Sequence, residues 1–183
     1  MSRTNLALIG YRATGKTNVG AALARAAGAE VIDSDAVVQR EAGCTIRELF
    51  QDQGEQHFRD LEQAAVETLC AGSRTILALG GGAVLREANR LRLRESCVCV
   101  WLRAAPPEIW RRLTADDASA AQRPALTGLS EYDEIVAVLS EREPIYRETS
   151  DFHVDTDGKS IEAVAEEIRA RVAADFPEVA AWL

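Results

Sequence analysis

The 183-residue sequence contains no apolar run long enough to cross a membrane as a helix. Met1 to Thr4 leads directly into the first expected strand, so we expect no signal peptide and a cytoplasmic protein. The sequence also has neither an internal repeat nor a low-complexity segment. Because this length suffices for one core and no stretch has the composition of a linker, we expect residues 1–183 to form a single domain.

Positive charge is scarce relative to negative charge, since 21 Lys and Arg residues stand against 29 Asp and Glu residues, a formal net charge of −8. This balance argues against nonspecific binding to nucleic acid or to an anionic membrane. We therefore expect small molecules as binding partners, a monomeric chain, and positive charge that is concentrated locally.

The four cysteines lack the spacing of a metal site, and none of them forms a C-x-x-C pair. Cys97 and Cys99 alternate along an apolar run, so they share one face of an expected strand. We expect both to behave as small buried apolar residues.

A glycine-rich stretch from Gly10 to Thr17 has the pattern G-x-x-x-x-G-K-[ST], and it follows a short apolar run and precedes a segment with helical periodicity. The pattern predicts a phosphate-binding loop, in which backbone N–H groups and a helix N-terminus hold phosphate. Lys16 would reach the β- and γ-phosphates, and the Thr17 hydroxyl would bind Mg²⁺. The alternative is an ordinary strand-to-helix turn with a solvated lysine.

Two carboxylates, Asp33 and Asp35, lie at the end of the second expected strand, residues 30–33. In open α/β sheets ligands bind at the carboxyl ends of the strands, so one carboxylate can face a metal and the other a substrate. The alternative is a structural role, with Ser34 or Asp35 capping a helix that begins at Ala36. The two roles are compatible.

A helical pattern runs from Thr45 to Ala71 with an interruption near Gly54. Arg59 lies one turn from both Glu55 and Glu62, and this spacing alone favours a surface ion-pair network.

Three consecutive glycines, Gly80, Gly81 and Gly82, follow the third expected strand, residues 75–79. Glycines at a strand end suggest that the backbone approaches a ligand closely, and a flexible turn is the alternative.

The polar stretch of residues 114–129 predicts a mobile loop that contains Arg123. It is either a lid that closes over bound nucleotide, with Arg123 meeting the transferred phosphate, or an inert surface loop. In the helix expected at 132–149, Pro144 should kink or break the chain just after Arg142.

Strands alternate with helices along the chain, and further strands are expected at 97–102 and 152–154. Crossover connections between parallel strands are right-handed and need helices. We therefore expect an α/β fold, a doubly wound parallel sheet of about five strands with helices on both faces.

The order of these motifs resembles the shikimate kinases, within the nucleoside-monophosphate-kinase-like P-loop kinases, over essentially the whole chain. The resemblance is carried by residues 10–17, 33–35, 54–62 and 80–82, Arg123 with Pro124, and Arg142 with Pro144 and Tyr146. It implies transfer of the ATP γ-phosphoryl group to the 3-hydroxyl of shikimate, with Mg²⁺ as cofactor. It also implies a lid at roughly 112–128 and an acceptor-binding helical segment at roughly 34–62.

Residue roles follow from the same resemblance. Arg59 and Arg142 would bind the shikimate carboxylate, and Asp35 would hold ring hydroxyls. The substrate would further lie against Gly80, Gly81 and Gly82. The implied catalytic residues are Lys16, Asp35 and Arg123, and the implied metal ligands are Thr17 and Asp33. Nucleotide would be bound by Gly10, Ala13, Thr14, Gly15, Lys16, Thr17, Arg112, which packs on adenine, and Arg123. Ala13 stands where the family usually has a third glycine, so the loop there must accommodate a Cβ.

Two other functions compete with this interpretation. A gluconate-type sugar-acid kinase shares the phosphate loop and also binds a carboxylate among hydroxyls, but Arg59, Arg142 and the Asp33-x-Asp35 pair favour shikimate. A non-catalytic nucleotide-binding module, with the lid as a signalling switch, would need neither Asp35 nor the two arginines.

Overall fold

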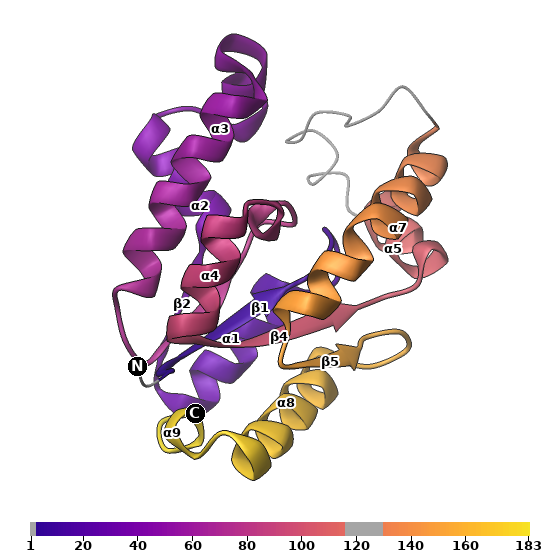
Figure 1. The fold of residues 1–183 in the computed structure, drawn as a ribbon. Coiled ribbons are helices and arrows are strands. Elements are labelled where there is room, and N and C mark those ends of the chain that lie inside the picture. Colours follow the sequence, from indigo (N-terminus) through magenta and orange to yellow (C-terminus); the bar gives the residue numbers. More distant parts are fainter. Residues whose placement is uncertain (1–2, 116–129) are drawn as a thin grey trace.

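A computed structural model describes residues 3–115 and 130–183, and its centre is one parallel sheet (Figure 1). The strands are β1 (Asn5–Ile9), β2 (Glu30–Asp33), β3 (Thr75–Ala78), β4 (Cys97–Arg103) and β5 (Phe152–Asp155). Their order in the sheet is β2-β3-β1-β4-β5, and every pairing between them is parallel. The expected five-stranded parallel sheet is confirmed.

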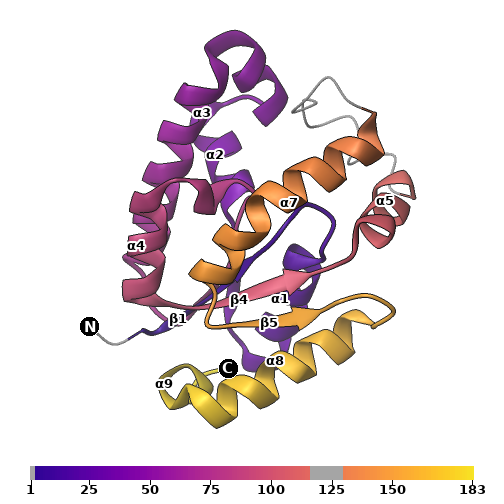
Figure 2. The same cartoon turned by 45° about the vertical axis from the view of Figure 1, so that its right-hand side comes forward.

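The central strand β1 is buried on both faces, which explains its continuous apolar sequence. Leu6 and Leu8 face one layer of helices, and Ala7 and Ile9 face the other, because successive side chains alternate. The first layer consists of α1 (Lys16–Ala27), α8 (Ile161–Asp175) and α9 (Pro177–Ala180). The second layer consists of α3 (Ile46–Cys70), α4 (Glu87–Ser96) and α7 (Glu131–Thr149). Helices therefore cover both faces, as expected (Figures 1 and 2).

The helices α2 (Ser34–Ala42) and α3 form an arm that projects beyond the sheet (Figure 1). Thr45 and Glu48 make the reciprocal hydrogen bonds of a capping box at the start of α3. Gly54 interrupts α3 with φ of 82° and ψ of 169°, a conformation that favours glycine, so the expected interruption is confirmed.

The cap of α2 differs from the expectation. Asp33 is the N-cap, and its Oδ1 accepts hydrogen bonds from the backbone N–H groups of Asp35 at 2.9 Å and Ala36 at 3.3 Å. The helix begins at Ser34, so the expected cap at Ser34 or Asp35 was wrong. The reason is that Asp33 still has the extended backbone of the strand end, which is the usual conformation of an N-cap.

The helix α7 runs through Pro144 without a break, and it crosses the sheet as one element (Figure 2). Of the kink or break expected just after Arg142, the break is therefore wrong. Proline removes one helical hydrogen bond, but both halves of α7 are packed. Ile135 and Val138 are buried before Pro144, and Tyr146 is buried after it.

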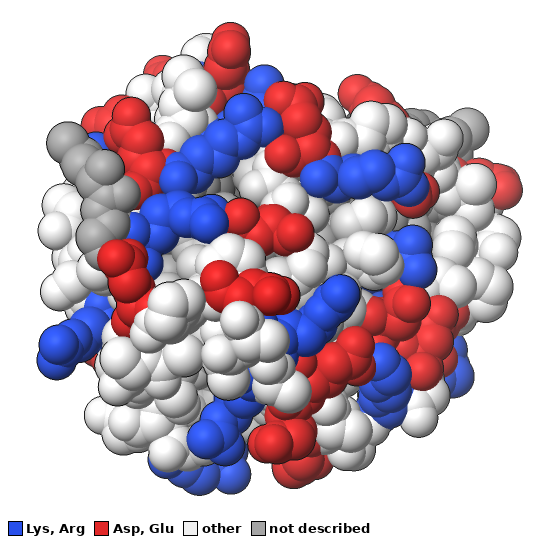
Figure 3. Space-filling model, turned by 60° about the horizontal axis from the view of Figure 1, so that its bottom comes forward, with Lys and Arg blue, Asp and Glu red and all other residues white. Residues whose placement is uncertain are grey.

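The remaining short helices are α5 (Pro106–Thr114) after β4 and the 3₁₀ turn η1 (Ala83–Leu85) after β3. Cys97 and Cys99 are buried free thiols in β4, as expected. On the side of α8 and α9, acidic and basic residues are interspersed (Figure 3). No helix in the described part of the chain is both long and apolar enough to span a membrane.

Candidate active site

The loop between β1 and α1 has the geometry of a phosphate cradle. Gly10 has φ of 137° and a Cβ there would overlap the carbonyl oxygen of Leu102, while Gly15 has φ of 93° at the N-cap of α1. Only glycine adopts both conformations readily. Lys16 extends back over the loop, where its Nζ donates to the carbonyl oxygens of Gly10 at 2.9 Å and Tyr11 at 2.7 Å.

Ala13 adopts the left-handed conformation, with φ of 61°. The backbone thus tolerates a Cβ at the position where the resembled family usually has glycine, at the conformational cost that non-glycine residues have in this region.

Thr17 and Asp33, the two expected metal ligands, are in direct contact. The Thr17 hydroxyl donates to Asp33 Oδ2 at 2.8 Å. Oδ1 of the same carboxylate caps α2. The pair therefore joins α1 to the end of β2 and presents only oxygen atoms, which fits a hard cation such as Mg²⁺ that completes its coordination with phosphate and water.

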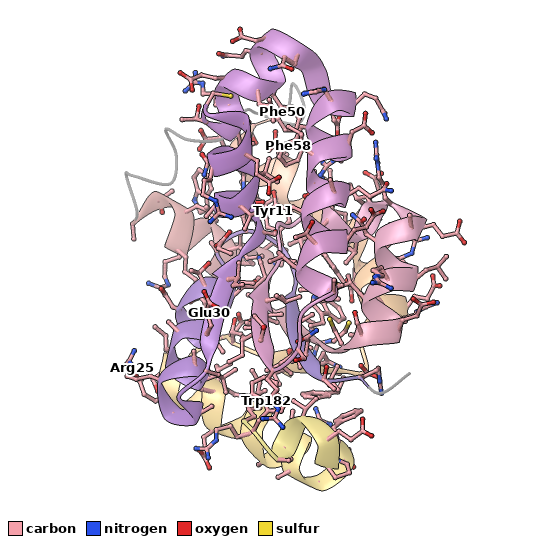
Figure 4. All side chains as sticks on the ribbon, turned by 90° about the vertical axis from the view of Figure 1, so that its left-hand side faces the viewer. Tyr11, Arg25, Glu30, Phe50, Phe58 and Trp182 are labelled. Atoms are coloured by element: carbon pink, nitrogen blue, oxygen red, sulfur yellow. The ribbon has the colours of Figure 1, made fainter. Side chains whose placement is uncertain are left out.

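A cavity lies between the arm and the loop that follows β1. It is lined by Tyr11, Arg12, Asp35, Ile46, Phe50, Phe58, Arg59, Glu62, Gly81, Gly82 and Arg142. Figure 4 shows Phe50 and Phe58 between the helices of the arm, with Tyr11 beneath them. The two phenyl rings are 4.7 Å apart. We call this cavity the acceptor pocket.

Arg59 faces the acceptor pocket and is held by two glutamates. Its Nη1 donates to Glu62 at 2.7 Å and its Nη2 donates to Glu55 at 3.1 Å. Arg59 is 8% exposed and Glu62 only 1%, so the expected surface network is instead a largely buried pair. The ion pairs of Arg59 that the helical spacing indicates are present, but the helix face that carries Arg59 packs inward.

Burial raises the pKa of Glu62 above the ordinary value for glutamate, and Asp35 adds repulsion that Arg59 opposes. Burial also disfavours the charge on Arg59, yet Glu62 and Glu55 together raise the pKa of the guanidinium. The arginine therefore stays charged, and its position is fixed by Glu62.

The glycine triple packs against these charged side chains. A Cβ on Gly80 would overlap Asp35 Oδ1, and a Cβ on Gly82 would overlap the guanidinium of Arg59. Gly80 and Gly82 therefore leave the pocket side chains in their observed positions, whereas a Cβ on Gly81 would make only ordinary contacts, at 3.5 Å and beyond.

Three hydrogen bonds with other elements fix the same loop. Ser34, which is fully buried, accepts a hydrogen bond from the Gly80 N–H at 2.9 Å. Tyr146 donates to the Gly81 carbonyl at 2.6 Å, and Arg142 Nη1 donates to it at 3.3 Å. Burial raises the pKa of Tyr146 to about 12, so its hydroxyl remains a donor at neutral pH. The structure thus brings Arg142 to the acceptor pocket alongside Arg59 and Asp35.

A cleft of about 490 Å³ lies on the other side of the loop. It is lined by Ala13, Thr14, Gly15, Asn18, Val19, Glu108, Arg111, Arg112, Leu113, Thr156, Gly158, Lys159, Ser160, Ile161 and Val164. Arg112 donates to the carbonyl oxygens of Ala13 at 3.1 Å and Thr156 at 2.8 Å, so it connects the loop to the segment after β5. We call this space the nucleotide cleft.

Sequence reasoning missed Ser34 as a support of the glycine triple and Thr156 as a support of Arg112. Both follow the carboxyl ends of strands, and this position is the signal that was available for them. Arg123 and most of the expected lid lie outside the described residues.

Comparisons with known proteins agree on one family. The family model described as shikimate kinase matches residues 12–173. The shikimate kinase of Rhodopirellula baltica is 39% identical over 164 residues, 90% of this chain and 88% of that protein. That of Moorella thermoacetica is 41% identical over 165 residues, 90% of this chain and 92% of that protein.

Solved structures give the same result. A shikimate kinase from Acinetobacter baumannii in complex with shikimate has a TM-score of 0.88 and 29% identity, with 95% of each chain covered. A gluconokinase from Sinorhizobium meliloti has a TM-score of 0.58 and 16% identity, covering 95% of this chain and 94% of that one, which is a likeness of fold alone.

Replacing Ser34 with Ala is expected to lower the free energy of unfolding by about 1–3 kcal/mol, because the buried Gly80 N–H loses its acceptor. Urea-induced unfolding of the wild-type and variant chains measures the change. Ser73→Ala, in the exposed turn before β3, is the matched control and is expected to change it by less than about 0.5 kcal/mol. Equal effects of the two substitutions would contradict the role assigned to Ser34.

Proposed function

This chain belongs to the shikimate kinase family and is an ATP-dependent kinase of shikimate, and we propose that its acceptor pocket binds shikimate while its nucleotide cleft binds ATP. The observation that carries the assignment of the pocket is the convergence of Arg59 and Arg142 on the glycine triple, beside the carboxylate of Asp35. Family membership decides against the gluconate-type kinase and the non-catalytic module.

The two arginines form a clamp for the shikimate carboxylate. A guanidinium presents paired donors that match the two oxygens of a carboxylate. Arg59 comes from α3 and Arg142 from α7, so the carboxylate is bound between two elements from opposite sides of the pocket.

Asp35 accepts hydrogen bonds from ring hydroxyls and orients the 3-hydroxyl toward the nucleotide. The same carboxylate can take the proton of the attacking hydroxyl, although a late proton transfer makes a strong base unnecessary. Its neighbour Glu62 stays with Arg59 and is therefore not assigned this task.

Charge stabilisation and alignment supply most of the catalysis, because phosphoryl transfer asks for little covalent chemistry from the protein. Backbone N–H groups of residues 10–17 hold the phosphates together with Lys16. The Nζ atom of Lys16 donates hydrogen bonds to the carbonyl oxygens of Gly10 and Tyr11, so the ammonium group lies over the phosphate loop. Arg112, which lines the nucleotide cleft, packs on the adenine base. Arg123, predicted from the sequence, would add charge at the transferred group.

Thr17 and Asp33 would hold Mg²⁺, whose bound form neutralises charge on the phosphates. Thr17 would contribute its hydroxyl and Asp33 one carboxylate oxygen. The other oxygen of Asp33 caps α2, and this keeps the carboxylate in place.

The organisation of the molecule follows from these roles. We assign residues 1–183 to one P-loop kinase domain, with the acceptor-binding segment at roughly 34–62 and the lid at roughly 112–128. A monomeric, cytoplasmic enzyme without nucleic-acid or membrane partners is consistent with the acidic composition.

The function is tested by measuring ADP release from MgATP with and without shikimate. ADP formation is expected to depend on shikimate, because transfer requires the hydroxyl acceptor in its pocket. Gluconate serves as the control acceptor and is expected to give only the background rate. Turnover of gluconate with none of shikimate would overturn the assignment.

Arg59→Lys is expected to raise the KM for shikimate about 10-fold or more, because lysine keeps the charge beside Glu62 but loses the paired donors. The KM for ATP is expected to stay within about 3-fold of wild type. Arg40→Lys, on the exposed face of α2, is the matched control for the same chemical change. Equal shifts in both KM values would contradict the clamp.

Thr17→Val, which removes the hydroxyl and keeps the shape, is expected to raise the Mg²⁺ concentration for half-maximal activity by about 10-fold or more. Thr17→Ser retains the hydroxyl and is expected to resemble wild type. A Mg²⁺ titration at saturating ATP and shikimate compares the two. Identical titrations for both variants would refute a ligand role for Thr17.

A further inference from the structure

The phosphate loop separates the two cavities of the active site. Tyr11 and Arg12 line the acceptor pocket, whereas Ala13 to Gly15 line the nucleotide cleft. On the acceptor side, the Gly81 backbone lies against Gly10 and Arg12, since a Cβ on Gly81 would be 3.5 Å from the Arg12 nitrogen. A phosphoryl group that moves from ATP to the acceptor therefore crosses the boundary at which Arg12 is located.

Arg12 is connected to α7 by an ion pair. Its Nη2 lies 3.3 Å from Oε1 of Glu134, and the Glu134 residue is 3% exposed. The guanidinium also lies 5.6 Å from the centre of the Tyr11 ring. Glu134 is in the first turns of α7, the helix that also carries Arg142 and Tyr146. One helix thus contacts both the clamp for the acceptor and the arginine of the loop.

Two polar atoms of adjacent residues at this place have no hydrogen-bond partner among the described residues. Arg12 Nε and the Tyr11 hydroxyl are both buried and make no hydrogen bond within residues 3–115 and 130–183. Tyr11 as a whole is 2% exposed, and its burial raises the pKa of the phenol, so the hydroxyl carries its proton. A buried donor without an acceptor is unfavourable. Two such donors beside a cavity indicate that a ligand oxygen satisfies them.

We propose that Arg12 contacts the phosphoryl group in transit between ATP and the acceptor, and that Glu134 is the positioning residue that holds Arg12 at the boundary. This rests on the proposed function. In the step itself, the bond between the γ-phosphorus and the bridging oxygen of ADP breaks, a bond from that phosphorus to the acceptor oxygen forms, and the hydroxyl proton passes to the carboxylate of Asp35.

The chemistry of the two residues fits these tasks. A guanidinium offers planar paired donors to phosphoryl oxygens and keeps its charge at all working pH values. Donors that are already in place stabilise charge that spreads over the transferred group. Glu134 does not itself line the acceptor pocket, and it reaches the pocket through its ion pair with Arg12, which does.

The test is a double-mutant cycle on kcat with Arg12→Met and Glu134→Gln, assayed with ATP and shikimate. Arg12→Met is expected to lower kcat about 100-fold and to change both KM values less than about 3-fold. Glu134→Gln is expected to lower kcat about 10-fold, and the double variant is expected to match Arg12→Met alone because both changes act on one group. Glu131→Gln, an exposed neutralisation in the same first turn of α7, is the control and should retain wild-type kcat.

Two results would overturn the proposal. One is an Arg12→Met variant with kcat near wild type. This result would overturn the proposal even if the Glu134→Gln variant did not fold. The other is a double variant whose losses multiply, which would assign Glu134 a separate structural role. Absence of shikimate-dependent ADP release in the wild-type chain would instead refute the proposed function, so the two failures are distinguishable. Partial recovery of kcat in Arg12→Lys is expected, because charge returns without the paired donors.

Discussion

The parallel alignment of five strands is the constraint on which the rest of the molecule depends. Because all strands run the same way, their carboxyl ends meet at one edge of the sheet. Four parts of the site lie at such ends: the phosphate loop follows β1, Asp33 ends β2 and Asp35 follows it, the glycine triple follows β3, and Thr156 follows β5. Residues far apart in the sequence therefore reach one site without any long excursion of the chain.

This edge also explains how an acidic chain binds anionic substrates. Three cations among the described residues of the site are oriented by backbone carbonyl groups before any ligand binds: Lys16 by two loop carbonyls, Arg142 by the Gly81 carbonyl, and Arg112 by those of Ala13 and Thr156. A side chain that is already oriented loses less conformational entropy when it binds a ligand. The fixed orientation of these cations in the site thus compensates for the net charge of −8 of the whole chain.

The sequence predicted the strands, the phosphate loop and the positions of Thr17, Asp33 and Asp35, because periodicity and strand ends are local signals. It did not predict that Arg59 and Glu62 are buried, since spacing along a helix does not say which face packs inward. It also predicted a kink or a break just after Arg142, whereas α7 does not break there, and Ile135, Val138 and Tyr146 pack on both sides of Pro144. Asp33 caps α2 where Ser34 or Asp35 was expected to, and Ser34 supports Gly80, which was not expected. Apart from the cap, these errors concern tertiary contacts, which no local pattern contains.

The two glutamates around Arg59 differ in a way that bears on substrate entry. The Glu62 side chain is 1% exposed and its bond to Nη1 is 2.7 Å, whereas the Glu55 side chain is 60% exposed and its bond to Nη2 is 3.1 Å. An exposed pair contributes little, about 0–1 kcal/mol, but separating a buried pair leaves an uncompensated charge and costs several times more. On the proposed function, a carboxylate that enters the acceptor pocket would replace Glu55 at small cost, while Glu62 keeps the guanidinium in place. The buried partner fixes the position of the arginine, and the exposed partner leaves its outer donors available for exchange.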